Sequence, residues 1–384
     1  MTTAFVLAGL RTPIGRFGGA LASLSAVQLG TSAARASLDA SGLQASDIDL
    51  CVAGLARQAG CGPNPARQIG WKAGLGEGVP AYTLNQACAS GLAALMAAVR
   101  HIQCGEAEAV LVVGAESMSN VPYLAPNLRW GTKMGHKPLR DAMYHDGLHC
   151  PLCDRIMGET VQALADELNI SRHDQDAFAL ESQRRCAQAD WSSQLVPLAE
   201  LAHDEHPRAE ANLDELARLK PVFTKQGSIT AGNSSGITDG AAALVVASEA
   251  LVQSRGLQPL ARYLGGSVVG LAPERMGLGP VPAIERYHRL RGDNPADYDW
   301  VEINEAFAAQ VLACQQSLRV PPEKLNPWGG SIALGHPIGC SGARIAVTAL
   351  HGLAARGGGR ALTSLCVSGG MGICAGFEVY PPRR

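Results

Sequence analysis

Apolar and polar residues follow the same order of segments in two parts of the chain. In the first part, short apolar runs at 50–54 and 108–117 lie on either side of a segment with helical spacing. That segment places apolar residues at i, i+3 and i+4: Leu92, Leu95, Met96, Val99 and Ile102. Short strands that alternate with helices of about 12 residues are typical of parallel pairing through crossover connections. The pattern predicts a layered α/β fold.

The second part repeats the first. Residues 41–54 align with residues 291–304, so that Asp49 meets Asp299, and Asp47 likewise meets Asp297. The pair Ser90-Gly91 matches Ser341-Gly342 at nearly the same spacing, and a β-rich run follows each of these pairs. Matches at one spacing indicate two halves of common design, each reading strand, helix, strand, helix, strand.

A long insert interrupts the first half. The strand that ends near 119 is separated from the apolar run 238–249 by residues 120–237, which are polar, contain prolines and are partly helical. In the second half the corresponding strands are nearly continuous. We therefore predict an N-terminal half of residues 1–119 plus 238–255, an inserted loop domain of 120–237 and a C-terminal half of 256–384. The insert is expected to cover a site formed between the halves.

Composition restricts the classes of function. The 384 residues are 47% hydrophobic and 17% charged, with a formal net charge of −2, which argues against a nucleic-acid partner. No run approaches 18 apolar residues, and the opening segment lacks the pattern of a secretion signal, so we expect no membrane partner and a cytoplasmic location. The 11 cysteines are scattered, which favours reduced thiols over disulfides.

Cys88 lies at or just before the first turn of the predicted helix. Free N–H groups and the positive end of the helix dipole stabilise an anion there, so we expect a thiol pKa lowered toward the reactive range. Ala89, Ser90 and Gly91 are small and leave room above the sulfur. By itself, an inert buried cysteine is the more common outcome.

Three further residues are candidates for the same site. His336 precedes the second-half loop that corresponds to the Cys88 loop, so the repeat predicts that the two loops face each other. Cys366 ends an apolar run before a glycine-rich turn, and Asn304 ends the predicted strand DWVEIN before the predicted helix EAFAAQVLA. Each also has a structural interpretation: a loop histidine, a small core residue and a helix cap, respectively.

The motifs NQACASG, GNSSGITDGAAA, NEAFA, GGSIALGHPIGCSGARI and CVSGGMG resemble the motif set of the thiolase family, in the family's order and across the whole chain. The resemblance implies a five-layered α/β/α/β/α sandwich of two βαβαβαββ halves, with a loop domain inserted in the first. It implies an acyltransferase of fatty-acid metabolism that cleaves 3-ketoacyl-CoA with CoA, as in β-oxidation, or runs the reverse Claisen condensation. A homodimer or homotetramer is also implied.

The resemblance also implies residue roles. Cys88 would be the acylated nucleophile, His336 its activator and Cys366 the acid/base for the acetyl α-carbon. Asn304 would hold an oxyanion-hole water, and the N–H groups of Cys88 and Ser368 would hold a tetrahedral oxyanion.

For CoA, the family pattern implies that the substrate thioester binds through the insert. Ser235 would bind the pantetheine, Phe223 and Phe307 would line its channel, Arg208 would face the adenine nucleotide, and Met157 would wall the acyl pocket. Coenzyme A is a substrate here, and neither a metal nor a permanently bound cofactor is expected.

Other interpretations remain open at this stage. Ile156 stands where the acetoacetyl-forming branch commonly has histidine, and Ser368 stands where glycine is common, so chain length and direction are open. Cys150 and Cys153 form a CxxC, typical of zinc or redox sites, but no second such motif accompanies them. A decarboxylating ketosynthase would need a second histidine where Cys366 stands. A non-enzymatic relative would be expected to lose one of the three central residues.

Overall fold

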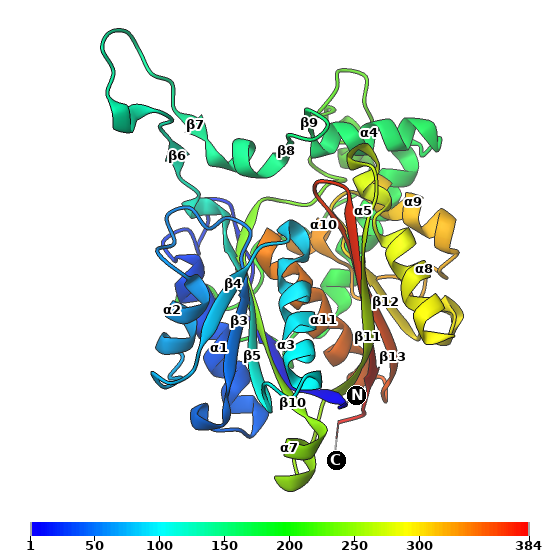
Figure 1. Cartoon of the computed structure of the whole chain (residues 1–384). Coiled ribbons are helices and arrows are strands. Elements are labelled where there is room, and N and C mark those ends of the chain that lie inside the picture. Colours follow the sequence, from blue (N-terminus) through cyan, green and yellow to red (C-terminus); the bar gives the residue numbers. More distant parts are fainter. Residues whose placement is uncertain (1, 383–384) are drawn as a thin grey trace.

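Two β-sheets stand side by side with helices between them and outside them (Figure 1). The computed structural model describes residues 2–382. The first sheet has the order β4–β3–β5–β10–β1 and the second β12–β13–β14–β11, joined where β1 pairs with β11. The strands are β1 (Ala4–Arg11), β3 (Leu50–Gly54), β4 (Ala81–Leu84), β5 (Ala109–Ser117), β10 (Thr238–Ser248), β11 (Ala261–Gly270), β12 (Trp300–Ile303), β13 (Gly359–Val367) and β14 (Met371–Val379).

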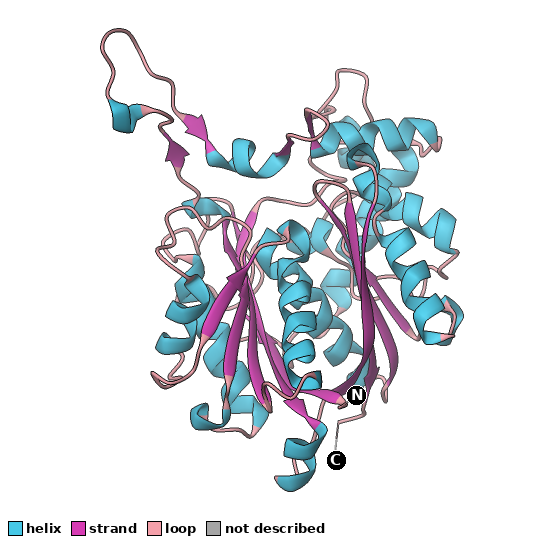
Figure 2. Ribbon diagram, viewed as in Figure 1, coloured by secondary structure: helices cyan, strands magenta, loops and turns pink. Residues whose placement is uncertain are grey.

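The helices complete five layers, which Figure 2 shows as alternating cyan and magenta. The central layer is α3 (Ser90–Gln103) and α11 (Ile338–Ala355), and the outer layers are α1 (Ala26–Ser41) with α2 (Pro65–Lys72) and α8 (Pro280–Arg291) with α9 (Ala308–Leu318). The predicted α/β/α/β/α sandwich is therefore confirmed, as is the helix after Cys88. Among the described helices, α11 alone is long and apolar enough to cross a membrane, and it is buried in this core.

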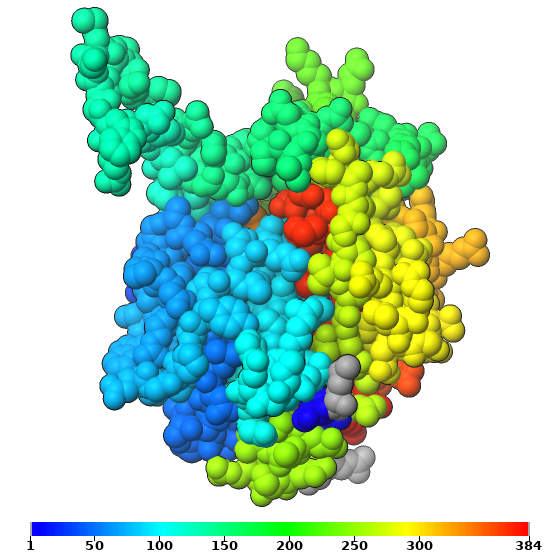
Figure 3. Space-filling model, viewed as in Figure 1, coloured from blue at the N-terminus to red at the C-terminus, as the bar shows by residue number. Residues whose placement is uncertain are grey.

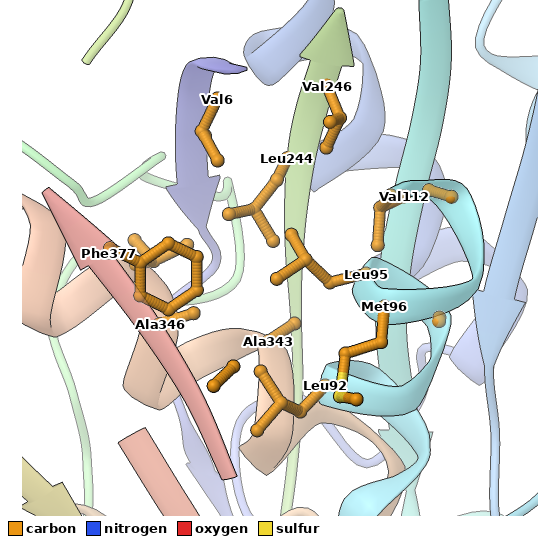
Figure 4. Packing of buried hydrophobic residues seen from close by; sticks show 14 of the residues in the cluster. Val6, Leu92, Leu95, Met96, Val112, Leu244, Val246, Ala343, Ala346 and Phe377 are labelled. Carbon is orange, nitrogen blue, oxygen red and sulfur yellow. The ribbon is translucent and has the colours of Figure 1, made fainter. Parts of the chain in front are cut away.

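Glycine lets the two central helices cross closely. A Cβ on Gly91 of α3 would stand 2.5 Å from the backbone nitrogen of Ala343, and one on Gly342 of α11 would collide with the backbone of Leu92. Around the crossing, side chains of both helices pack against both sheets. Figure 4 shows this packing for Leu95 of α3, Ala346 of α11 and Phe377 of β14 among others. The repeated Ser-Gly pair is therefore the contact point of the halves.

The repeated aspartates have matching structural roles. The Asp49 carboxylate accepts from the backbone N–H groups of Glu108 and Ala109, at 2.7 and 3.0 Å. Asp299 accepts in the same way from Arg360 at 2.9 Å. Each aspartate fixes the start of the strand that follows the central helix of its half, which explains why the sequence repeats it.

The second half departs from the repeat at one strand. Where the first half has β4, the second half has a single parallel bridge between Val301 and Leu325. The remaining order of elements matches that of the first half.

The insert leaves and returns on neighbouring strands, since Ser117 of β5 lies opposite Asp239 of β10. Figure 3 shows it lying across the top of both halves, and the loop between β6 and β7 projects outward. Its elements are β6 (Tyr123–Leu124), β7 (Arg140–Asp141), β8 (His149–Cys150), β9 (Arg155–Ile156), α4 (Met157–Glu167), α5 (Arg172–Gln188) and α6 (Leu213–Arg218). Elsewhere lie β2 (Gly15–Arg16), α7 (Glu249–Ser254) and α10 (Ser331–Leu334).

Candidate active site

A cavity of about 240 Å³ lies where the two halves meet the insert. It brings together residues that are far apart in the sequence and that the motifs had singled out: Cys88, Met157, Phe223, Ser235, Phe307, His336, Cys366 and Ser368. Most of the other lining residues are apolar. Such a concave, mostly apolar cavity with a few convergent polar groups is typical of a small-molecule site.

Cys88 sits in a short 3₁₀ turn (Ala87–Ala89) directly before α3. Ala87 adopts a left-handed backbone conformation with φ of 46°, which costs a non-glycine residue roughly 1 kcal/mol. The Asn85 side chain accepts from the Ala87 N–H at 2.9 Å and supports this conformation. The turn leaves Cys88 partly exposed at the wall of the cavity.

The surroundings of Cys88 raise the pKa of its thiol, contrary to the sequence-based expectation. Burial is the largest influence and raises its pKa, whereas Arg57 and the N–H groups of Ser368 and Cys88 itself lower it. The net shift is upward, so the expectation of a lowered pKa is wrong: removal from water outweighs the helix terminus. Cys88 therefore needs a base before it can attack.

His336 lines the same cavity and is the candidate for such a base. Its Nδ1 lies 2.5 Å from the Ser341 hydroxyl, whose own proton is donated to the Pro337 carbonyl at 3.0 Å. The hydroxyl oxygen must then accept, so the hydrogen-bond network assigns the proton to Nδ1. Nε2 is left buried without a partner among residues 2–382. Burial, Arg344 and Arg57 lower the pKa of His336 to about 3, so the imidazole is neutral.

Cys366 lies near the end of β13, opposite Gly372 of β14. Burial, together with Cys88, raises its pKa well above the usual range, so this thiol holds its proton firmly. In the turn that follows, the left-handed conformations fall on Gly369 and Gly370, with φ of 83° and 80°. Ser368 therefore does not need the freedom of a glycine.

Asn304 is buried behind the site and is not among the residues that line the cavity. An Arg344 guanidinium nitrogen donates to the Ser331 hydroxyl at 2.9 Å, and Ser331 donates to the Asn304 Oδ1 at 2.7 Å. This chain fixes the orientation of the amide and leaves Nδ2 buried without a partner in the described chain. Since α9 begins at Ala308, Asn304 does not cap that helix.

Two of the predicted channel residues are in direct contact. The rings of Phe223 and Phe307 meet edge to face, with centroids 5.9 Å apart. Ser235 donates its N–H to the Ala306 carbonyl at 3.0 Å, which ties the GNSSG loop to NEAFA. Arg208 lies elsewhere, in a separate hollow beside His206, so the structure does not bring it to this cavity.

Sequence reasoning missed several groups at the site. Glu116 accepts hydrogen bonds from the backbones of Ala56, Arg57 and Gly339, and the Arg57 side chain lines the cavity. Ser341 could have been noticed in the sequence, because it repeats Ser90, but nothing in the sequence indicated that it contacts His336. Arg57 had none, since a lone arginine after a strand is usually solvated.

The CxxC lies in the insert, at the β8–β9 hairpin. Cys150 is buried and Cys153 is half-buried. Within residues 2–382 no group of three or more His, Cys, Asp or Glu side chains is placed to hold a metal ion. The described residues therefore supply no further ligands for a zinc ion at this motif.

Comparisons with known proteins identify the family of the chain. Residues 4–250 match the model of the thiolase N-terminal domain, and residues 257–379 match that of the thiolase C-terminal domain. The chain is similar to a probable acetyl-CoA acyltransferase of Staphylococcus aureus (strain COL), with 42% identity over 393 residues covering 99% of this chain and 100% of the relative. It is also 42% identical to the acetyl-CoA acetyltransferase of Escherichia coli (strain K12) over 391 residues, covering 98% and 99%.

Two solved structures share the fold closely. Human mitochondrial 3-ketoacyl-CoA thiolase in complex with CoA superposes with a TM-score of 0.96 at 39% identity, covering 98% of each chain. The Bacillus anthracis acetyl-CoA acetyltransferase also gives 0.96, at 40% identity and 99% coverage of each chain.

Proposed function

The chain belongs to the thiolase family and is an acyltransferase, and from this premise we propose that it cleaves 3-ketoacyl-CoA with CoA through an acyl-Cys88 intermediate. The observation that carries the proposal is the cavity that Cys88, His336 and Cys366 share. The products would be acetyl-CoA and a shortened acyl-CoA.

In the first step, the bare Nε2 of His336 takes the proton of Cys88, and the sulfur attacks the 3-keto carbon. A neutral imidazole beside a neutral thiol suits this transfer, because the thiolate then forms only when substrate is in place. The N–H groups of Ser368 and Cys88 lower the pKa of the Cys88 thiol by hydrogen bonding. They would stabilise the tetrahedral oxyanion.

In the second step, the C–C bond breaks and leaves the enolate of acetyl-CoA. Cys366 would protonate the enolate carbon, since its raised pKa keeps a proton available there. The enolate oxygen would be held by His336 and by a water on Asn304, whose Nδ2 is the free end of a fixed amide. Free CoA then attacks the acyl-Cys88 thioester: its thiol proton passes to Cys366, the proton held by His336 returns to the departing Cys88 sulfur, and the shortened acyl-CoA is released.

The CoA moiety would enter along the insert, past Ser235, Phe223 and Phe307, with Met157 against the acyl group. Arg208 stays a prediction for the adenine nucleotide. The three-part division of the chain, a cytoplasmic location and a homodimer or homotetramer likewise belong to the proposal, as does the lack of a permanently bound cofactor.

The alternative is an acetyl-CoA C-acetyltransferase that works mainly in the acetoacetyl-CoA-forming direction. The names of the Escherichia coli and Bacillus anthracis relatives favour it, whereas the human structure is named for 3-ketoacyl-CoA. The same residues serve both directions by reversal of each step, so metabolite ratios would decide between them.

The test uses two cysteine variants and a control. Cys88→Ala is expected to lose acyl-enzyme formation from acetyl-CoA, measured by intact-protein mass spectrometry. Cys366→Ala is expected to become acylated but to stop exchanging the α-protons of acetyl-CoA with deuterated water, measured by NMR. Cys104→Ala removes an exposed thiol and is expected to behave like the wild type. Normal thiolysis by either active-site variant would contradict the proposal.

A further inference from the structure

Arg57 is the one residue with a permanent charge among those that line the cavity. Around it the wall is mostly apolar, with Met118, Leu148, Met157 and Ile338 among its members. A single guanidinium in such a wall is unusual, because charged side chains are seldom buried without a partner.

The loop that carries Arg57 is held in place. The Glu116 carboxylate accepts from the backbone N–H groups of Ala56 at 3.2 Å, Arg57 at 3.0 Å and Gly339 at 2.8 Å. Both oxygens of Glu116 are thus engaged by backbone groups, and Glu116 forms no ion pair with Arg57 within 4.0 Å. The position of Arg57 is therefore set by the backbone rather than by a salt bridge.

The guanidinium has no hydrogen-bond or ion-pair partner among residues 2–382, although the nearby Glu116 carboxylate, which lies beyond ion-pair distance, interacts with its charge. The residue is 8% exposed, its Nε is buried without a hydrogen bond, and no carboxylate of residues 2–382 pairs with it. A Cβ on Gly147 would stand 2.5 Å from one terminal nitrogen and 2.7 Å from Nε, so a larger residue at 147 would displace the guanidinium from this position. A buried cation without a partner is unfavourable, and a bound anion would relieve that penalty.

The anion would come from the acyl group of the substrate. Arg57 lines the same cavity as Cys88 and His336, so its charge lies in the wall around the reacting atoms. The pantetheine arm of CoA carries neutral amides, and its phosphates are at the end far from the thioester. Apart from the transient oxyanion and enolate of the reaction itself, the part of a CoA thioester that can bring an anion near Cys88 is therefore the free end of a short acyl chain.

We propose that Arg57 binds a carboxylate at the free end of the acyl group, so that this enzyme prefers 3-oxo dicarboxylic acids linked to CoA through one end. The proposal rests on the proposed function and names its substrate class. The planar guanidinium fork matches a carboxylate with two parallel hydrogen bonds. Arg57 is then a specificity-determining residue that does not take part in bond making.

Acyl-enzyme formation isolates this recognition. The thiol of Cys88 attacks the thioester carbon of an acyl-CoA, the C–S bond to CoA breaks, and the Cys88 proton passes by way of His336 to the departing CoA sulfur. No oxidant or reductant is needed. The distal carboxylate remains on the acyl group and stays at Arg57.

The experiment compares pairs of acyl-CoAs of equal length with and without the distal carboxylate: succinyl-CoA against butyryl-CoA, and glutaryl-CoA against pentanoyl-CoA. The rate of acylation of the full-length enzyme is measured by release of CoA thiol, and the product by intact-protein mass spectrometry. In at least one pair the wild type is expected to favour the carboxylate by roughly tenfold or more, the size of a charge-assisted hydrogen bond.

Variants then assign the preference. Arg57→Leu is expected to abolish or reverse the ratio within a pair, and Arg57→Lys to keep part of it, because the charge remains and the fork is lost. Arg255→Leu, at an exposed ion pair remote from the cavity, serves as the matched control. Using the ratio within a pair cancels any effect of Arg57 on the reactivity of Cys88.

Two results would overturn the proposal. One is a wild type that accepts both members of every pair equally well, and the other is an Arg57→Leu variant that slows both members by the same factor, which would assign Arg57 to Cys88 reactivity alone. Both leave the proposed function intact, because butyryl-CoA still acylates Cys88. Failure of the wild type to be acylated by any of these compounds or by acetyl-CoA would instead refute the proposed function.

Discussion

Replacing Ser341 with alanine removes the hydroxyl that accepts the Nδ1–H of His336. The ring then has two options. It keeps the proton on Nδ1, now a buried donor without a partner, or it moves the proton to Nε2, the nitrogen proposed as the base for Cys88. The first option carries a desolvation penalty, and the second removes the base, so both slow the acylation of Cys88.

The size of the effect follows from the penalty. A buried donor left without an acceptor costs ~1–3 kcal/mol. At about 1.4 kcal/mol per factor of ten, acylation slows roughly 5- to 150-fold. The contact is short, at 2.5 Å, and Ser341 is fully buried, so water is not expected to replace the hydroxyl.

The assay is stopped-flow release of CoA thiol after mixing enzyme with acetyl-CoA. The matched control is Thr348→Ala: it lies on the same helix, is equally buried, and loses a hydrogen bond of 3.2 Å to Gln194 that does not involve His336. Both variants are expected to lose stability, and Ser341→Ala alone to lose rate. A Ser341→Ala enzyme that acylates as fast as the wild type, or a Thr348→Ala enzyme that slows equally, would refute the tautomer argument.

The remaining predictions concern pH and helix packing. The pKa of His336 falls to about 3 on folding. Between pH 6.5 and 3, His336 is therefore protonated in the unfolded chain and neutral in the folded protein. The contribution of His336 to the free energy of unfolding is complete above pH 6.5 and decreases below it by up to about 1.4 kcal/mol per pH unit. In urea unfolding, the free energy of unfolding should therefore decrease more steeply toward acid pH for the wild type than for His336→Asn. For the same reason, acylation of Cys88 should show no break near pH 6.5, and such a break would contradict a neutral imidazole. Gly91→Ala is expected to destabilise the fold by about 1–3 kcal/mol, measured by thermal unfolding, because its Cβ would collide with Ala343. The control Gly78→Ala should be tolerated, because Gly78 has open space around it. Equal stability of the two variants would disprove the close crossing of the helices.

The sequence alone determined the architecture, because its signals are local or repeated. Helical spacing after Cys88 requires one buried face, and α3 has it. Asp49 and Asp299 recur because each half uses an aspartate to accept a backbone hydrogen bond at the start of the same strand. Motifs in family order then led to the thiolase family, which the comparisons established.

Only the tertiary structure decided the electrostatics of the site. The pKa of Cys88 depends on how much water the insert and the second half exclude, and no local pattern records that exclusion; the helix terminus was visible in the sequence, and burial outweighed it. The tautomer of His336 and the isolation of Arg57 depend on neighbours that folding brings together. Solvation and through-space charge are properties of the assembled cavity, whereas hydrophobic periodicity is a property of the chain.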